Sequence, residues 1–354
     1  MIELSLLLGI ACILAWLSKI NKIFTYSLIL VLSLFSGLRT SYNDTQVYVY
    51  GFVNKIPADI WDLGLEDLRL GQNPGFLLYQ SFIKSYISTD PQIFLLISAV
   101  ITNILIIAFY RKYARFFSLT IFMYITSGLF VFSMAAIKQS LAMSIIAWSI
   151  PFALQRNWIK FLLLVLLAMT IHSFALIFLI IPLFIGEKIW GKKAYLLILS
   201  ALVLGIFFTN FINIFVPLIN DLKEIETSYS YFEGESINIF RVMVFGVTPV
   251  ISWLYRKRVN LHNDQVLNLS INMSIISFIF MLIAINGGAN SFGRMANYFE
   301  LFTYVALPVL LQKYLQPKIR TFIVLLAIIG YYGFFYYQFG IVKQFQYNSI
   351  FDLW

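Results

Sequence analysis

Six ionisable residues lie inside apolar segments or just beyond their ends, where charged side chains are rare. Four are cations, one is a carboxylate and one is an imidazole: Arg39, Lys138, Arg241, Arg294, Asp44 and His172. A cation near the centre of a bilayer costs about 2.5–3.5 kcal/mol on insertion scales, so cations at that depth usually face a cavity or a partner. Clustered Arg and Lys suit a phosphate or diphosphate, and a carboxylate or a neutral imidazole can take a proton from an attacking hydroxyl. Together these groups favour group transfer from a lipid diphosphate.

Each of these residues also has an ordinary structural explanation. Arg39 can snorkel from the end of its helix, and Asp44 lies among residues that are typical of turns. His172 can be hydrogen-bonded within a bundle, Arg294 can flank its helix, and Arg241 fits an interface anchor. The stronger evidence is the side of the membrane that they share. All six are expected in the external half, whereas independent anchors would scatter over both faces.

The elements that must position these residues are membrane helices. The chain has 354 residues, of which 60% are apolar and 12% are charged, whereas soluble globular proteins carry about 25% charged residues. This composition excludes a soluble enzyme, a disordered chain and a nucleic-acid-binding module. The aromatic share of 18% is typical of chains with many bilayer interfaces.

Positive charge is concentrated in short clusters between the apolar segments. Of the 25 Lys and Arg residues, 16 lie in six clusters: Lys19 and Lys22; Arg111, Lys112 and Arg115; Arg156 and Lys160; Lys188, Lys192 and Lys193; Arg256, Lys257 and Arg258; Lys313, Lys318 and Arg320. Membrane proteins keep such clusters on the cytoplasmic side, so we expect both chain termini outside. The clustering also argues against a nucleic-acid partner, despite the net charge of +9.

Ten apolar segments approach the roughly 20 residues that a spanning helix needs. They are residues 3–18, 23–38, 92–110, 116–134, 138–154, 195–215, 238–255, 265–285, 295–312 and 321–338. With every basic cluster inside, the segments alternate in direction throughout. The prediction is an all-α integral membrane protein, one domain over 1–354, with about ten transmembrane helices.

One further apolar block, residues 161–185, lies between two basic loops. If both loops are cytoplasmic, the block must enter and return, and each arm of about 12 residues is roughly 18 Å long as a helix. That is shorter than the hydrocarbon core of about 30 Å. We therefore expect a re-entrant hairpin with Thr170, His172 and Ser173 at its tip, which gives 12 helices if each arm is counted. The alternative is that the block is one ordinary span, which would reverse the membrane orientation of every later segment.

Two external loops are long. Residues 39–91 are rich in Asp, and their second half has near-helical apolar spacing from Phe76 to Ile87, which predicts a helix lying in the interface. Residues 216–237 form a second, acidic external loop.

Metal and cofactor chemistry have little support in the sequence. Only two histidines are present, His172 and His262, and no paired-His zinc pattern occurs. The acidic residues of 216–237 suit a solvated loop. There is no phosphate-binding P-loop and no Gly-rich dinucleotide motif. The one cysteine, Cys12, lies in an apolar segment, so we expect no metal, no cofactor and no disulfide framework.

Five short motifs follow one another between residue 37 and about residue 308. They are Gly37-Leu38-Arg39 with Asp44 and Tyr48; Asn73-Pro74-Gly75-Phe76; Ile137-Lys138-Gln139-Ser140-Leu141-Ala142; His172-Ser173-Phe174-Ala175-Leu176; and Gly293-Arg294 with Tyr298-Phe299. In this order they resemble the motifs of the EpsG-like, Wzy-type polysaccharide polymerases. Three departures stand out. Lys138 stands where Arg is usual, which keeps the charge but loses the planar fork; Asn73 replaces a glutamate; and Phe174 shifts the Ser-Ala spacing.

The resemblance implies a membrane glycosyltransferase of the GT-C type that needs no metal. Such an enzyme transfers an undecaprenyl-diphosphate-linked glycan onto a lipid-linked repeat unit at the periplasmic, or outer, face of the bacterial inner membrane. Its expected partners are a flippase and a chain-length regulator. The residues would divide as follows: diphosphate contacts Arg39, Lys138 and Arg294, with Arg241 as a further candidate; general base Asp44 or His172; sugar platforms Tyr48 and Tyr298.

Two other functions stay open at the level of sequence. A ligase of related architecture would move finished glycan onto another acceptor. A flippase or transporter would be expected to place polar residues near the midplane, often within internal repeats. Here the polar residues are expected at the outer end, and no convincing repeat is visible.

Overall fold

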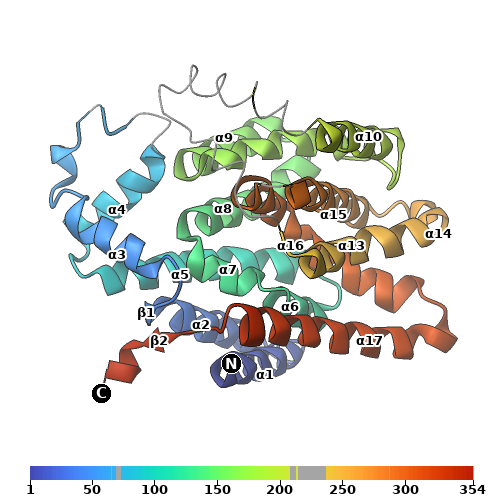
Figure 1. Cartoon of the computed structure of the whole chain (residues 1–354), viewed down its shortest axis with the longest axis horizontal. Helices are drawn as coiled ribbons and strands as arrows, with labels where there is room; N and C mark the ends of the chain where they lie inside the picture. Colours follow the sequence, from blue (N-terminus) through green and yellow to red (C-terminus); the bar gives the residue numbers. More distant parts are fainter. Residues whose placement is uncertain (65, 69–72, 208–212, 214–236, 287, 354) are drawn as a thin grey trace. The chain divides into compact units, whose positions relative to one another are not determined.

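A computed structural model of the chain describes residues 1–64, 66–68, 73–207, 213, 237–286 and 288–353. Nearly all regular structure in this part is helical, and one two-stranded ribbon is its only sheet. The all-α prediction is therefore confirmed. The chain forms two compact units, residues 1–179 with 328–354 and residues 180–327 (Figure 1).

The first unit holds most of the motifs. Its α-helices are α1 (Ile2–Leu17), α2 (Ile23–Gly37), α3 (Thr45–Asn54), α4 (Pro74–Tyr86), α5 (Pro91–Tyr113), α6 (Phe117–Thr126), α7 (Leu129–Ala135), α8 (Ile137–Leu154) and α9 (Trp158–Ile171), joined by the end of α17 (Pro317–Tyr336). The unit also contains the 3₁₀ segments Ile60–Asp62 and Ile350–Leu353, the π-helical turn Tyr337–Val342 and the first part of the 3₁₀ segment Ser173–Phe184. α2 packs against α5, and α5 against α8.

The second unit is built around α15 and α16. Its α-helices are α10 (Lys192–Ile206), α13 (Ile239–Leu254), α14 (Arg256–His262), α15 (Gln265–Ile283) and α16 (Arg294–Val309), followed by the start of α17. Short π-helical turns precede and follow α16, at Ala289–Gly293 and Leu310–Tyr314. The acidic loop predicted over 216–237 lies, except for Ile237, outside the described residues.

Local signals explain where the helices begin and end, and α5 is a clear case. The carboxylate of Asp90 accepts a hydrogen bond from the backbone nitrogen of Gln92 (2.8 Å), and Pro91 occupies the first helical position. Arg111 and Lys112 lie in the last turn, where the helix dipole favours cations. The Arg111 guanidinium also donates to the carbonyl oxygen of Ser18, just beyond α1 (3.1 Å), so two basic loops meet at this end of the first unit.

Four described helices are long and apolar enough to cross a membrane: Pro91–Tyr113, Ile137–Leu154, Gln265–Asn286 and Pro317–Val342. The number rises to six if each of two bent pairs, α6 with α7 and α13 with α14, counts as one span. The chain is thus a helical membrane protein. The count of ten spans, or twelve, stays a prediction.

The predicted span 116–134 is broken rather than continuous. α6 and α7 meet at a bend of 51° around Ser127 and Gly128. Gly128 has φ +92°, a left-handed conformation that favours glycine, and a Cβ atom there would lie 2.8 Å from the ring of Phe339. The sequence analysis missed this break because a lone glycine in an apolar run does not distinguish a bend from a straight helix.

The block 161–185 is interrupted where the sequence predicts it. α9 ends at Ile171, His172 has an extended backbone (φ −151°, ψ 113°), and a 3₁₀ segment runs over Ser173–Phe184. As helices, the two arms measure roughly 21 Å and 24 Å, each shorter than a hydrocarbon core of about 30 Å. The re-entrant course of the block stays a prediction.

The end of the chain returns to the beginning of the 39–91 loop. Strand β1 (Arg39–Ser41) pairs antiparallel with β2 (Asn348–Ser349). The Tyr347 hydroxyl donates to the carbonyl oxygen of Phe35 (2.8 Å), and the Tyr347 ring stacks on the rings of Phe35 (4.5 Å) and Phe345 (5.8 Å). The C-terminal end of α2 and the C-terminal segment of the chain therefore lie together.

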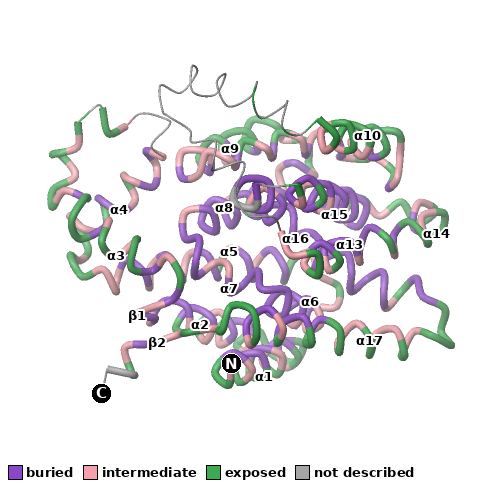
Figure 2. Tube along the Cα trace, viewed as in Figure 1, coloured by how far each residue is buried: buried purple, intermediate pink, exposed green. Residues whose placement is uncertain are grey.

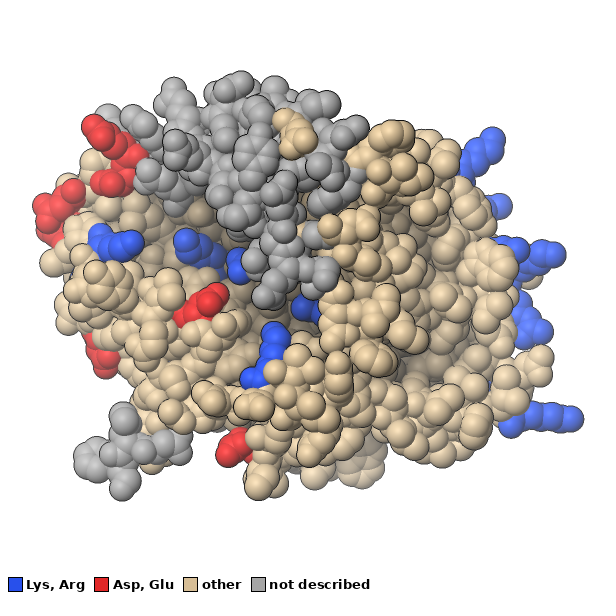
Figure 3. Space-filling view, in the orientation of Figure 1, with Lys and Arg blue, Asp and Glu red and all other residues tan. Residues whose placement is uncertain are grey.

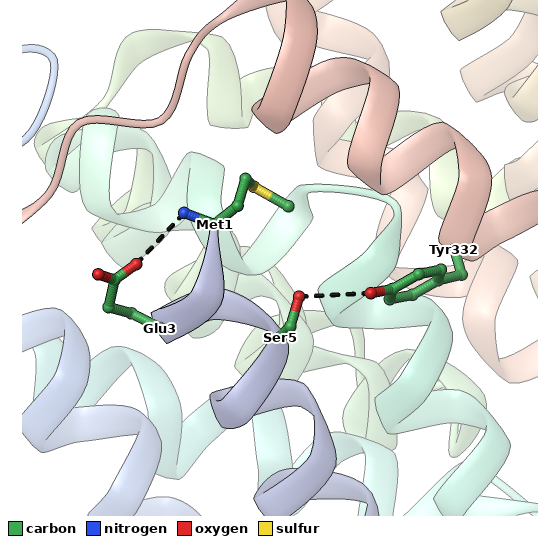
Figure 4. A network of polar contacts seen from close by, with 4 residues as sticks. All are labelled: Met1, Glu3, Ser5 and Tyr332. Carbon is green, nitrogen blue, oxygen red and sulfur yellow. Dashed lines mark hydrogen bonds and ion pairs between the residues drawn. The ribbon is translucent and has the colours of Figure 1, made fainter.

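The first helix is also tied to the last. The Ser5 hydroxyl lies 3.4 Å from the hydroxyl of Tyr332 on α17, and the N-terminal ammonium pairs with Glu3 (3.2 Å) (Figure 4). The contact between Ser5 and Tyr332 joins α1 to the part of α17 that belongs to the first unit.

Several helices have exposed residues along one face (Figure 2), and many of these residues are large and apolar. On α17, Phe322 and Ile329 are each 67% exposed, and on α1 Leu6 and Trp16 are also exposed. Large exposed apolar surfaces are rare on soluble proteins. A surface of this kind is suited to contact with lipid.

Charge is unevenly distributed within each unit (Figure 3). In the first unit, acidic side chains gather over the region of α3 and α4, where Asp59, Asp62 and Asp67 are exposed. In the second unit, Lys and Arg side chains protrude at the end that carries α14, where Lys257 and Arg258 are exposed.

Hydrogen bonds join two of the basic loops at that end of the second unit. Asn260 bonds through its side chain to both the backbone nitrogen (3.0 Å) and the carbonyl oxygen (3.2 Å) of Ile189. The Trp190 indole donates to the Ser252 hydroxyl (2.9 Å). The segments around residues 188–193 and 252–260 therefore lie next to each other at the same end of the second unit.

The packing of Tyr347 yields a test of the C-terminal ribbon. Tyr347→Phe removes one hydrogen bond and should cost about 0.5–1.5 kcal/mol, whereas Tyr347→Ala also removes the stacked ring and should cost about 3–5 kcal/mol. Thermal unfolding of the detergent-solubilised protein measures both. Equal transition temperatures for Tyr347→Ala and the unmodified protein would contradict the docking of the ribbon.

Candidate active-site cavity

A cavity of about 520 Å³ opens in the first unit between α3, α4 and the start of α8. Its lining is mixed, with apolar, aromatic, amide and charged side chains: Asp44, Val47, Tyr48, Gly51, Lys55, Ile56, Asp67, Phe76, Leu77, Gln80 and Lys138. The structure thus brings together three of the sequence-predicted site residues, Asp44, Tyr48 and Lys138. A concave site of this size with a few polar groups is typical of ligand pockets.

Helix α3 supplies one wall of the cavity. The lining positions 44, 47, 48, 51 and 55 are three or four residues apart, so they share one helical face. Asp44 is the N-cap residue of α3, although its carboxylate makes no capping hydrogen bond. The positive end of the helix dipole favours a carboxylate at this position. Asp44 therefore lies at the edge of the cavity, at the N-terminal end of α3.

Lys138 enters the cavity from the opposite element. It is the second residue of α8, whose N-terminus has no side-chain cap, and its ammonium lies 5.4 Å from the centre of the Phe76 ring. Within the described part of the chain, Lys138 has no acidic partner. A cation at a helix N-terminus is disfavoured by the dipole, whereas the two together form a strong site for an anion.

The Asn73-Pro74-Gly75-Phe76 motif connects the cavity with the His172 segment. The Asn73 side-chain oxygen accepts from the backbone nitrogen of Ser173 (3.3 Å), and Asn73 itself has φ +56°, a conformation that Asn tolerates. Gly75 packs directly on Thr170. Phe76, one residue further, lines the cavity. His172 does not line the cavity itself, but its segment contacts the start of α4.

Arg39 has a different environment from the one the sequence predicts for a ligand-binding cation. Its side chain is 2% exposed, and it donates to Thr45 Oγ1 (3.0 Å), to the carbonyl oxygen of Ser36 and to that of Met134 (2.8 Å). Burial lowers the pKa of its guanidinium to about 10, so the group stays charged at neutral pH. It does not line the cavity of Lys138.

Three further predicted residues belong to the second unit. The Arg241 guanidinium donates to the Asn297 side-chain oxygen (2.9 Å) and lies over the Phe245 ring (5.8 Å). Arg294 is the first residue of α16, and Tyr298 is fully buried within that helix. A sugar contact by Tyr298 would need its ring to become exposed. How these residues relate to the cavity of the first unit stays a prediction.

Three polar residues of the cavity wall, Lys55, Asp67 and Gln80, were not predicted from the sequence. Lys55 lies eleven residues after Asp44, three turns along the same helical face. Gln80 lies one turn after Phe76 on α4 and is buried. The helical spacing of Lys55 from Asp44, and of Gln80 from Phe76, indicates that they share a face. For Lys55 this spacing can be used only once residues 45–54 are known to form a helix.

Among the described residues, no group of three or more His, Cys, Asp or Glu side chains is arranged to hold a metal ion. The independence from metal stays a prediction.

The apolar helices define an integral membrane protein, and its cavity is lined in part by charged side chains. A family model described as the EpsG family matches residues 22–350. The chain therefore belongs to the EpsG family, a Wzy-like family of polysaccharide polymerases, and its role is that of a membrane polymerase of the glycosyltransferase type. No curated protein and no solved structure matches the chain.

The close approach of Gly75 to α9 gives a direct test of the site's architecture. In Gly75→Ala, the new Cβ would lie 2.8 Å from Thr170 Cβ and 3.0 Å from its carbonyl carbon, so backbone must shift. We expect a loss of about 1–3 kcal/mol in stability and reduced polymer. Gly9→Ala is the matched control, because nothing lies within 4 Å of that position. Unfolding in detergent and the cellular polymer yield measure both; equal behaviour would refute the contact.

Proposed function

We propose that this protein transfers a glycan from undecaprenyl diphosphate onto the non-reducing end of a lipid-linked repeat unit, at the external face of the bacterial inner membrane. The observation that carries the proposal is the cavity of the first unit. It combines an anion site, formed by Lys138 and the N-terminus of α8, with the carboxylate of Asp44. A diphosphate and an acceptor hydroxyl are the partners that such a pair suits.

The reaction follows from these groups. The acceptor hydroxyl forms a bond to the anomeric carbon of the donor glycan while the bond from that carbon to the diphosphate oxygen breaks. The hydroxyl proton passes to a general base, and undecaprenyl diphosphate leaves with the electron pair. Lys138 stabilises the charge that develops on the leaving oxygen. Arg241 and Arg294, which belong to the second unit, are proposed as diphosphate-binding residues.

Asp44 is the preferred general base. It lines the cavity together with Lys138. His172 is the alternative, because its segment contacts the start of α4 through Asn73. Tyr48 is proposed as the sugar platform on the cavity wall, and Tyr298 as a second one. No metal takes part in this scheme.

The external location of the site is supported by contacts within each unit. The 39–91 loop is hydrogen-bonded to the C-terminal segment through β1 and β2, which suits two segments on the external side. Arg111 contacts Ser18, and the loops around Ile189 and Asn260 contact each other, as expected for basic loops gathered on the cytoplasmic side. A flippase that delivers the lipid-linked unit and a chain-length regulator are the proposed partners.

The site residues are tested in a strain that lacks the gene and carries variants on a plasmid. Lys138→Ala and Asp44→Asn should each lower polymer formation about 100-fold or more, within the range found for general acid–base groups. His172→Ala should be mild if Asp44 is the base. The glycan is read on a gel, and membrane insertion is verified by immunoblot. Long polymer from both Lys138→Ala and Asp44→Asn would refute the assignment.

The same gel separates the rival functions. Loss of a polymerase leaves a single repeat unit attached to its lipid acceptor, whereas loss of a ligase or of a flippase leaves none. A deletion strain without any attached unit would therefore favour one of the rivals.

The proposed orientation is tested with single cysteines. Cys12, the only native cysteine, is replaced by Ala, and one cysteine is then introduced at an exposed position: Thr89 or Gln346 on the proposed external side, Lys257 on the cytoplasmic side. In intact spheroplasts, a membrane-impermeant maleimide should label the first two and spare the third. Labelling of Lys257→Cys without prior lysis would overturn the orientation.

A further inference from the structure

Arg39 and Lys84 are two cations of the first unit that donate hydrogen bonds to carbonyl oxygens at helix ends rather than to acidic side chains. The last carbonyl oxygens of a helix have no partner within it, and the negative end of the helix dipole attracts cations. At membrane depth, where water cannot substitute, such carbonyl oxygens must find a donor in the protein.

Arg39 serves three elements at once. Through Ser36 it contacts the last turn of α2, and through Met134 the last turn of α7. Its third contact is the hydroxyl of Thr45, which begins α3, is fully buried and donates to the carbonyl oxygen of Tyr42 (2.6 Å). The planar fork of Arg allows these contacts to diverge from one side chain.

Arg39 joins the two elements that carry the residues of the proposed site. Thr45 directly follows Asp44, so the contact fixes the turn that carries the carboxylate. Met134 lies four residues before Lys138, at the break where α7 ends and α8 begins. One buried guanidinium therefore connects the two elements from which the base and the anion site extend.

Lys84 holds the other end of α3. Its ammonium donates to the carbonyl oxygens of Phe52 (2.9 Å), Val53 (2.8 Å) and Ile56 (2.7 Å), and it also lies over the Phe52 ring (5.7 Å). These are the orphan carbonyls at the C-terminus of α3. The helix that forms one wall of the cavity is thus fixed at both ends by a cation.

Building on the proposed function, we infer that Arg39 and Lys84 are positioning residues. Arg39 holds the start of α3 at the break before α8, and Lys84 holds the end of α3 against α4, so that Asp44 and Lys138 face the same substrate. Arg39 then acts on the rate of transfer without touching the diphosphate. This role differs from that of Lys138, whose ammonium lines the cavity and has no acidic partner among the described residues.

The two roles differ in a measurable way. The purified full-length protein is assayed in detergent for transfer at saturating donor and, separately, for binding of undecaprenyl diphosphate as the probe. Arg39→Ala should lower kcat about 100-fold while changing the probe's Kd less than about threefold, whereas Lys138→Ala should raise that Kd about tenfold or more, the scale of one lost charged contact. Arg39→Lys should recover part of kcat, because it keeps the charge but reaches fewer acceptors.

Further variants keep the test independent of folding. Thr45→Val removes the acceptor of Arg39 with little change in shape and should lower kcat about tenfold; combined with Arg39→Ala it should add little, as expected for groups in one network. Lys84→Met should lower kcat as well, and Lys84→Arg should restore it. Arg111→Ala is the matched control, because it removes a helix-capping cation from Ser18, away from the cavity, and kcat should not change.

The inference is overturned if Arg39→Ala weakens probe binding as much as Lys138→Ala does while kcat at saturating donor is preserved. It is also overturned if Arg39→Ala, Thr45→Val and Arg111→Ala lower activity and melting temperature in parallel, since that pattern means global destabilisation only. Failure of the proposed function looks different, because the unmodified protein would then bind no undecaprenyl diphosphate and Lys138→Ala would have no effect.

Discussion

The first unit depends on one buried guanidinium, that of Arg39, which donates hydrogen bonds to carbonyl oxygens at the ends of two helices. In a chain with 60% apolar residues, every interruption of a helix leaves carbonyl oxygens that neither lipid nor apolar side chains can serve. α2 ends at Gly37 and α7 at Ala135, and Arg39 donates to a carbonyl oxygen of each. Removing one partner of a buried charged hydrogen bond costs more than the bond itself contributes. Arg39 therefore supplies the donor for a carbonyl oxygen at each of these two helix ends.

The surroundings keep that guanidinium dry. β2 pairs with β1 directly beside Arg39, and the rings of Phe345, Tyr347 and Phe35 stack along the same edge. Water excluded from this region cannot compete for the Ser36 and Met134 carbonyl oxygens, and hydrogen bonds to charged groups are worth more in a low dielectric. The last residues of the chain thus strengthen an interaction that begins near residue 39.

Sequence periodicity and charge predicted most helices and the break at His172, because apolar runs and capping residues are local signals. The same reasoning could not find the ribbon between residues 39 and 349, since two- and three-residue strands have no pattern of their own and pair over more than 300 residues. It also could not assign the partners of Arg39 and Lys84. Those partners are backbone carbonyl oxygens, which look identical in every residue. Lys55 was missed for a related reason, since its place on the cavity wall follows from the course of α3.

The comparison of Arg39 with Lys138 shows how a structural cation differs from a ligand-binding one when both are expected at the same depth. Arg39 lies beyond the C-terminal end of a helix, where the dipole favours a cation, and its donors already have acceptors. Lys138 lies at an N-terminal end, where the dipole disfavours it, beside an aromatic face that offers only a weak contact. A cation kept in an unfavourable field, with access to a cavity, is stabilised when an anion arrives. That imbalance favours the proposed role of Lys138 as the contact of the diphosphate and the inferred role of Arg39 as a positioning residue.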